Sequence, residues 1–299
     1  MLFASFGEAA ATDAVRVAEG VYVFVGAAGE ISPENLGRIG NSGFIVSDTE
    51  VTLIDSGVSH AHGLELLAAV RRVTDKPLGR LILTHAVQEF IYGTSAYVDA
   101  GARPLCHAGS ATLMRSRCEH CLQNLRTALG EPAMAGTRLI VPDDLVDGST
   151  DLRSGDRIIE LIHPGWASTP GDLMVLDRRS GVLFAGGVVT NGRIPELRDG
   201  QLDTWLETLQ SLGQRPLNRV IPGYGPPMPP ERVADTLDYL RALDAAVQQM
   251  YAASASLMET IEGADAPAFR GWTGYDSIHR RNAQLRYLQL ETKELDSSR

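Results

Sequence analysis

The chain has 299 residues, of which 44% are hydrophobic and 21% charged, and its formal net charge is -10. This composition is typical of a folded globular protein, and the acidic balance argues against nonspecific nucleic-acid binding and against docking on an anionic membrane, which both need a basic face. No apolar run approaches the roughly 18 residues of a membrane-spanning helix, so membrane insertion is not expected, and three cysteines are too few for a disulfide scaffold.

The first residues, 1–11, carry a short apolar patch but lack the basic start and the full apolar run of a secretory signal. Export cannot be read from this chain, so its location stays unassigned, with a cytoplasmic protein as the default expectation for lack of a clear signal.

The first half of the chain is predicted to alternate strands and helices. Strands are expected at 15–25, with a hairpin at Glu19-Gly20, and at 43–46 and 51–54. The i, i+3 spacing of Leu64, Leu67, Val70 and Val73 predicts an amphipathic helix. A short buried strand at 81–83 precedes helices at 88–99 and 110–129.

The second half repeats this order. Strands are predicted at 139–141, 158–162, 173–176 and 182–185, followed by a helix at 202–212 and a strand at 220–221. From residue 231 the chain is predicted to be helical, with a division near 263–271. Two similar halves indicate an α/β protein with two sheets packed face to face and helices outside. The predicted organisation is a tail at 1–14, a main domain at 15–229 and a helical extension at 230–299 packed on it.

Five segments stand in a recognisable order, at 53–57, 84–93, 163–172, 183–187 and 221–225. Their order and spacing resemble those of the metallo-β-lactamase superfamily, whose fold is an αββα sandwich. Softer matches at 41–46, 117–122, 193–200 and 281–283 resemble its quinoprotein-relay-type zinc hydrolase branch. The resemblance implies a hydrolase-type fold and makes a periplasmic location an alternative.

The metal-binding motif departs from the superfamily's pattern. Its metal loop reads T-H-x-H-x-D-H-x-x-G, and here only the first histidine is kept, as His85, while the aspartate is replaced by Glu89. Five further ligand positions hold residues that are not metal ligands of this family: Val87, Phe90, Ser168, Gly187 and Tyr224. The residues that shape the loops remain, including Asp55, Gly93, Gly171 and Asp172.

These replacements predict a degenerate metal site. A catalytic zinc needs three protein ligands and an open position, and a two-metal site needs a bridging group as well. We therefore expect no metal and no other cofactor in the cleft, with His85 as a remnant ligand. The space that ions and water occupy in the superfamily would be filled by the bulky side chains of Val87, Phe90 and Tyr224. Because these walls are largely apolar, an unpaired charge in the cleft would raise the free energy of the folded protein.

His85 and Glu89 are the candidate catalytic residues. The favoured interpretation is structural, with His85 hydrogen-bonded locally and Glu89 paired with His85 or with an arginine. The alternative is an acid–base pair, or a rebuilt zinc site, that supports hydrolysis. His163 is expected to pack at a strand end, and His60 and His62 to be solvated in a loop.

Cys118 and Cys121 lie i, i+3 on one helix face. A structural or redox role is favoured, and a metal site completed by Cys106, His107 or His120 is the alternative. Trp166 is expected at the cleft mouth, where Tyr92, Phe90 and Tyr224 either join it in binding a ligand or pack together as a plug.

The sequence therefore predicts a non-hydrolytic or strongly diverged member of this fold. Its partner would be a small molecule or a protein bound in or near the former active-site cleft, whose candidate residues are Val87, Phe90, Trp166, Ser168, Gly187 and Tyr224. A homo-oligomer formed through the C-terminal helices is a further expectation.

Overall fold

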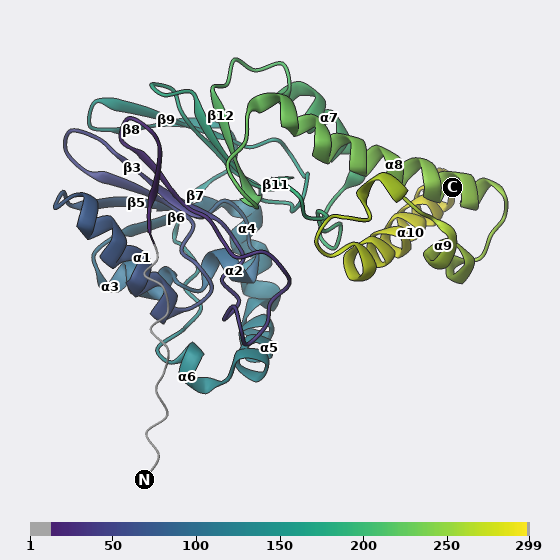
Figure 1. Cartoon of the computed structure of the whole chain (residues 1–299), viewed down its shortest axis with the longest axis horizontal. Helices are drawn as coiled ribbons and strands as arrows, with labels where there is room; N and C mark the ends of the chain where they lie inside the picture. The colour runs from purple at the N-terminus through teal and green to yellow at the C-terminus, as the bar shows by residue number, and fades with distance from the viewer. Residues whose placement is uncertain (1–12, 298–299) are drawn as a thin grey trace, which may run out of the picture.

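In the computed structural model, which describes residues 13–297, two β-sheets pack face to face and helices cover both outer faces (Figure 1). The predicted tail at 1–14 lies almost wholly outside the described residues. The first sheet has the strand order β1 (Val15–Ala18), β2 (Val21–Phe24), β3 (Ser42–Val46), β4 (Val51–Ile54), β5 (Leu78–Ile82), β6 (Arg103–His107), β7 (Asp144–Val146). The second has the order β12 (Arg219–Tyr224), β11 (Val182–Thr190), β10 (Met174–Asp177), β9 (Arg157–Ile162), β8 (Thr150–Ser154).

The two sheets share a core of aliphatic side chains. Ile45, Ile54 and Ile82 of the first sheet belong to one buried cluster with Ile159 and Val175 of the second. Strands β4 to β7 pair in parallel, so the carboxyl ends of β4, β5 and β6 meet at one edge of the first sheet. Loops that follow these ends are therefore brought together.

The outer face of the first sheet is covered by the helices of the first half. They are α1 (His60–Val73), α2 (Gln88–Ile91), α3 (Thr94–Asp99), α4 (Ala108–Leu113), a π-helical segment (Met114–Cys118), α5 (Glu119–Leu129) and α6 (Glu131–Met134). Their apolar faces share a cluster with Phe44, Leu53 and Leu81 of the sheet.

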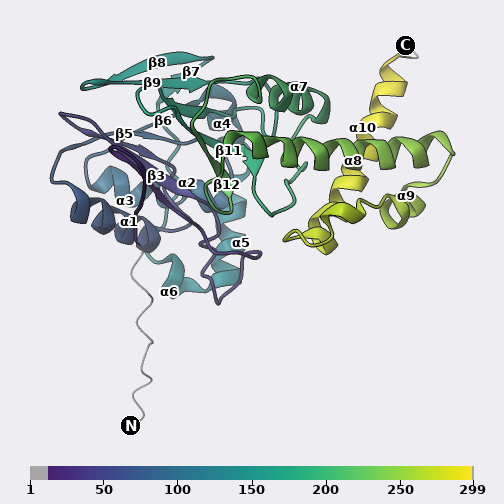
Figure 2. The same ribbon diagram turned by 45° about the horizontal axis from the view of Figure 1, so that its top comes forward.

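Helices α7 (Leu202–Leu212) and α8 (Val233–Ala252) pack against the second sheet through a cluster that contains Trp205, Leu240 and Leu183. The long α8 then extends beyond the sandwich, where α9 (Leu257–Gly263) and α10 (Arg280–Ser297) pack beside it (Figure 2). Short turns at Pro230–Arg232 and Pro267–Phe269 and a π-helical segment at Tyr275–His279 link these helices. None of the helices in the described part of the chain is long and apolar enough to cross a membrane.

The predicted αββα sandwich is present, but several elements differ from the prediction. Residues 139–141 form no strand, and the strand at this place is β7. The helix expected at 88–99 is two short helices, α2 and α3. In α1, Leu64 and Val73 are exposed, whereas Leu66 and Leu67 face the core. The i, i+3 spacing identified the helix correctly, but the buried face of the helix is rotated away from Leu64 and Val73 toward Leu66.

Candidate functional site

A buried carboxylate fixes the loop that carries His85. Asp55 follows β4, and its Oδ1 accepts a hydrogen bond of 2.8 Å from the Thr84 backbone N–H, while its Oδ2 accepts one of 2.8 Å from the Thr84 hydroxyl. Burial raises the pKa of Asp55 to about 7. Gly93 allows the next part of the loop to approach, because a Cβ there would lie 1.8 Å from the Ser56 carbonyl oxygen. These contacts hold the shape of the loop even though most of the metal-ligand positions of the superfamily are substituted in this chain.

His85 is almost fully buried and makes a local hydrogen bond. Its Nδ1 lies 2.7 Å from the Thr84 hydroxyl oxygen. Burial lowers the pKa of His85 to about 3, so the imidazole is neutral near pH 7. Its ring packs on Phe90, with the ring centroids 4.3 Å apart.

Phe90 and Tyr224 pack together as a plug beside His85. Phe90 has no exposed surface, and its ring meets that of Tyr224 edge to face with centroids 5.3 Å apart. The Tyr224 hydroxyl donates a hydrogen bond of 2.6 Å to Oε1 of Glu89. The aromatic pair therefore fills space and also provides the donor for the buried carboxyl.

Glu89 is not paired with His85 or with an arginine, so the expectation of such a pair was wrong. Its hydrogen-bond partner is Tyr224, which approaches from the other sheet, and its Oε2 is buried without a partner among the described residues. Burial raises the pKa of Glu89. This environment favours the protonated carboxylic acid over the carboxylate.

The position of the expected bridging aspartate has no room for a side chain. Gly187 lies on β11, and a Cβ on it would be 2.6 Å from the Ser168 Oγ and 2.9 Å from Cδ2 of His85. Ser168 itself donates a hydrogen bond of 2.7 Å to Oδ1 of Asp172. Hence the Ser168 hydroxyl stabilises its own loop, and Gly187 permits close packing of β11 against the loops that carry Ser168 and His85.

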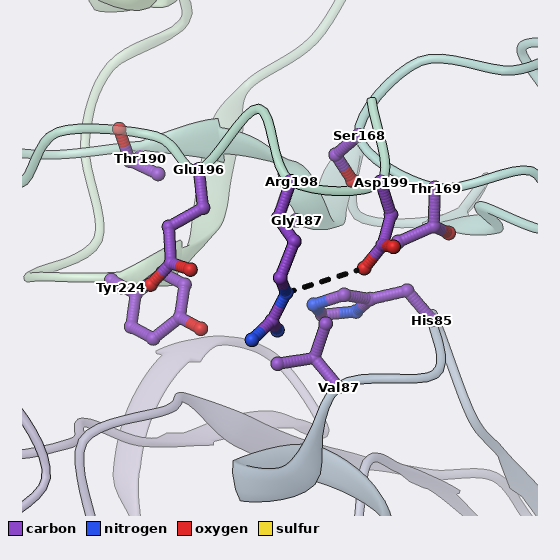
Figure 3. Close-up of a pocket in the computed structure, with 10 residues that line it drawn as sticks. All are labelled: His85, Val87, Ser168, Thr169, Gly187, Thr190, Glu196, Arg198, Asp199 and Tyr224. Atoms are coloured by element: carbon purple, nitrogen blue, oxygen red, sulfur yellow. Dashed lines mark ion pairs between the residues drawn. The ribbon is translucent and has the colours of Figure 1, made fainter. Parts of the chain in front are cut away.

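What remains of the cleft is a cavity of about 30 Å³. One water needs roughly 10–15 Å³, so the cavity has room for only a few waters. Figure 3 shows its wall, which is formed by His85, Val87, Ser168, Thr169, Gly187, Thr190, Glu196, Arg198, Asp199 and Tyr224.

Comparison with known proteins relates this architecture to one family. The profile of the "Metallo-beta-lactamase superfamily" matches residues 36–86. A "Metallo-beta-lactamase type 2" from Bacillus sp. (strain 170) is 24% identical over 220 residues, which cover 71% of this chain and 75% of the relative. Solved metallo-β-lactamases from Pontibacter korlensis and Hirschia baltica superpose with TM-scores of 0.63 and 0.60 at 19% and 18% identity. They cover 77% and 76% of this chain, and the chain covers 98% and 96% of theirs.

This chain has the metallo-β-lactamase fold. The profile match, the curated relative and the solved structures all support the superfamily. The helical C-terminal region, α8 to α10, follows the last strand of the sandwich.

The donor set in the cleft does not fit the metals of metallo-β-lactamases. Among residues 13–297, no group of three or more histidine, cysteine, aspartate or glutamate side chains is placed to hold a metal ion. Phe90 and Tyr224 occupy the cleft with aromatic rings, and Gly187 has no room for a carboxylate.

The loop between β11 and α7 supplies charged groups that the sequence interpretation did not single out. Both terminal nitrogens of Arg117 bond the carboxylate of Asp199, and Arg198 contacts the same carboxylate through Nε at 3.5 Å. The Arg193 guanidinium lies over the Tyr224 ring, 4.6 Å from its centroid. The only signal in the sequence was the resemblance of 193–200 to a family loop.

Trp166 and Tyr92 do not line the small cavity. Trp166 is 45% exposed, and its Nε1–H donates to the Asp199 carbonyl oxygen. Tyr92 is fully buried and donates its hydroxyl to the Cys118 carbonyl oxygen. Of the aromatic residues proposed for the cleft, Tyr224 lines the cavity and Phe90 lies buried behind its wall, against His85 and Tyr224.

The three cysteines are free thiols. Cys106 and Cys118 are buried and Cys121 is half-buried, while His120 is exposed. Burial raises the pKa of Cys118 to about 11, which favours the protonated thiol over the reactive thiolate. His107 stacks on His163, with the ring centroids 3.8 Å apart. Between residues 13 and 297, Cys118 and Cys121 belong to no group of three or more side chains that could hold a metal ion.

His60 and His62 are not the solvated pair that their loop position suggested. His62 is 6% exposed, and its Nδ1 accepts a hydrogen bond of 3.3 Å from the Val58 backbone N–H. The Nδ1 of His60 lies 3.0 Å from the Ser95 hydroxyl oxygen. Both residues lie in the first turn of α1, which docks them against neighbouring segments.

Proposed function

We propose that this protein is a non-hydrolytic member of the metallo-β-lactamase fold that binds a small molecule or a protein partner in or near the former active-site cleft. The observation that carries the proposal is the contact between α2 and β12, in which Tyr224 of β12 packs on Phe90 and donates a hydrogen bond to Glu89, both residues of α2. A hydrolytic metal site needs several converging donors, and here apolar rings and one carboxyl occupy their positions.

The physical reason is that the cleft holds few buried polar groups that would need a metal, and Glu89 has a hydrogen-bond donor for one of its two carboxyl oxygens. Several imidazoles and a carboxylate gathered with no ion would leave buried polar groups without partners. Phe90 replaces one such group with apolar volume, and Tyr224 adds a hydroxyl that serves Glu89. The loop scaffold around Asp55 is retained, so the substitutions change the chemistry of the cleft and preserve its frame.

The alternative is a hydrolase with a rebuilt site around His85 and Glu89. Glu89 favours it in one respect, because a buried carboxyl with a raised pKa has the property of a general acid. Against it, His85 faces Phe90 and Thr84, and Glu89 bonds Tyr224. The two groups therefore have different hydrogen-bond partners.

We further propose that the closest branch is the quinoprotein-relay-type zinc hydrolase branch. Two of the segments that resemble this branch, 193–200 and 281–283, contact each other. Oδ1 of Asn282 accepts a hydrogen bond of 2.9 Å from the Leu197 backbone N–H, and its Nδ2 donates one of 2.7 Å to the Pro195 carbonyl oxygen.

We also propose that the helices α8 to α10, which extend beyond the sandwich, form a surface for self-association.

A hydrolysis assay tests the proposal. Nitrocefin and an acyl thioester are incubated with the purified protein, with and without added zinc, beside an active metallo-β-lactamase. We expect no turnover above the buffer rate in either condition. Zinc-dependent turnover that is lost in His85→Ala would establish the rebuilt hydrolase instead.

A further inference from the structure

Arg198 holds a central place in the cleft. It lies in the loop between β11 and α7, and Figure 3 shows its guanidinium between the rings of Tyr224 and His85, pointing toward Val87. It lines the cavity of about 30 Å³ and also a neighbouring cavity of about 180 Å³. The permanent positive charge of the Arg198 guanidinium therefore lies in the wall that the two cavities share.

Most of the hydrogen-bonding capacity of Arg198 is unused. Within the described chain its one charged contact is from Nε to Oδ2 of Asp199 at 3.5 Å, and its terminal nitrogens have no partner. Asp199 already accepts bonds from both terminal nitrogens of Arg117. Because Arg117 compensates that carboxylate, the charge of Arg198 remains available to a ligand.

The larger cavity joins this charge to an apolar wall. Its volume is about 180 Å³, which holds a small organic molecule, since one water needs roughly 10–15 Å³. Ile31, Ile39 and Val87 provide the apolar part of the wall. Its remaining lining residues are polar or charged: Glu30, Gln88, Glu89, Arg193, Glu196, Arg198 and Arg281.

Several other charged residues of the wall already have partners, although Oε2 of Glu89 and Nε of Arg193 are buried without one among the described residues. Glu196 pairs with Arg193 at 3.4 Å and with Arg281 at 3.8 Å, and Glu30 accepts a hydrogen bond from Ser277. These carboxylates would repel a second negative charge on a ligand. A single anionic group beside Arg198 is compatible with the wall, whereas a dianion is not.

We propose that this cavity binds a short aliphatic monocarboxylate, with its carboxylate on the Arg198 guanidinium and its chain against Ile31, Ile39 and Val87. The planar guanidinium offers parallel N–H donors that match a carboxylate. This inference rests on the proposed function, which is ligand binding in or near the former active-site cleft, and it names the chemical class of that ligand.

The test is isothermal titration calorimetry of chelator-treated protein with acetate, propanoate, butanoate and pentanoate at constant ionic strength. We expect saturable binding that tightens about fourfold for each added methylene until the cavity is full. Butylammonium, which has the same number of carbon atoms as butanoate and the opposite charge, should not bind, and succinate should bind more weakly than butanoate.

Two matched variants locate the site. Arg198→Met should weaken butanoate binding at least tenfold, whereas Arg179→Met, which removes another half-exposed arginine paired with one carboxylate, should leave it unchanged. Val87→Thr, which keeps the shape of the side chain and adds a hydroxyl, should weaken butanoate more than acetate.

Three outcomes would overturn the inference. They are no saturable binding by any of the four carboxylates, equal binding to folded Arg198→Met protein, and binding of butylammonium as tight as that of butanoate. Zinc-dependent hydrolysis would contradict the proposed function, whereas these outcomes contradict only the ligand class, so the two failures are distinguishable.

Discussion

Restoring histidines at the plug should destabilise the metal-free protein. In the variant Val87→His, Phe90→His, Tyr224→His, the fully buried Phe90 loses apolar contacts and gains a buried polar ring, at about 2–4 kcal/mol. Loss of the Tyr224 hydroxyl leaves both oxygens of Glu89 without a donor, at about 1–3 kcal/mol. The half-buried Val87 adds less than about 1 kcal/mol.

The three costs are not additive, because Phe90 and Tyr224 touch. We expect the free energy of unfolding to fall by about 3–6 kcal/mol, as measured by urea unfolding at pH 7.5 in chelator. As a control, three histidines at exposed apolar positions, in Val15→His, Leu64→His and Met258→His, should change it by no more than about 0.5 kcal/mol each. A plug variant as stable as the parent would refute the packing account of the cleft.

Three further predictions follow from single contacts. Tyr224→Phe should lower the free energy of unfolding by about 1–3 kcal/mol, and much of that cost should disappear in the background Glu89→Leu, a coupling that a double-mutant cycle in urea measures. The pKa values of His62 and His85 are lowered to about 3 from 6.5, so the stability that their neutral forms contribute is present above about pH 6.5 and lost as the pH falls toward about 3. The raised pKa values of the buried Asp55 and Asp172 act in the opposite direction, so the test is the difference between variants: from pH 7 to pH 4 the unfolding midpoint of His85→Gln should rise relative to that of the parent, whereas that of His120→Gln should not. Replacing Cys118 and Cys121 by alanine should cost about 1–3 kcal/mol, and in the native parent a thiol reagent should modify the half-buried Cys121 before the buried Cys118; rapid modification of both would favour a redox pair.

Much of the fold could be predicted from the sequence because local patterns specified it. The short apolar run at 81–83 and the hairpin signal at Glu19-Gly20 lie at strands of the first sheet. Residues 139–141 misled the prediction, since Leu139 and Val141 pack on the helices of the first half and pair with no strand. The strand that does pair there, β7, is short and partly polar, so its place depends on β6 and not on its own pattern.

The candidate site was predicted in composition but not in its contacts. Motif positions located Val87, Phe90 and Tyr224, yet the partner of Glu89 comes from a strand more than 100 residues away, and no spacing rule links the two. The importance of Arg198 was missed for a similar reason. The Arg198 side chain is 43% exposed, and only the folded loop brings its guanidinium to the wall of the cleft.

The most direct test of the metal-free cleft is elemental analysis after equilibration with zinc. The protein is dialysed against excess zinc, freed of loosely bound ions by gel filtration, and measured beside His85→Ala. The account predicts far less than one zinc per chain in the parent and no difference between the two proteins. One or more tightly bound zinc ions per chain, lost in His85→Ala, would contradict it.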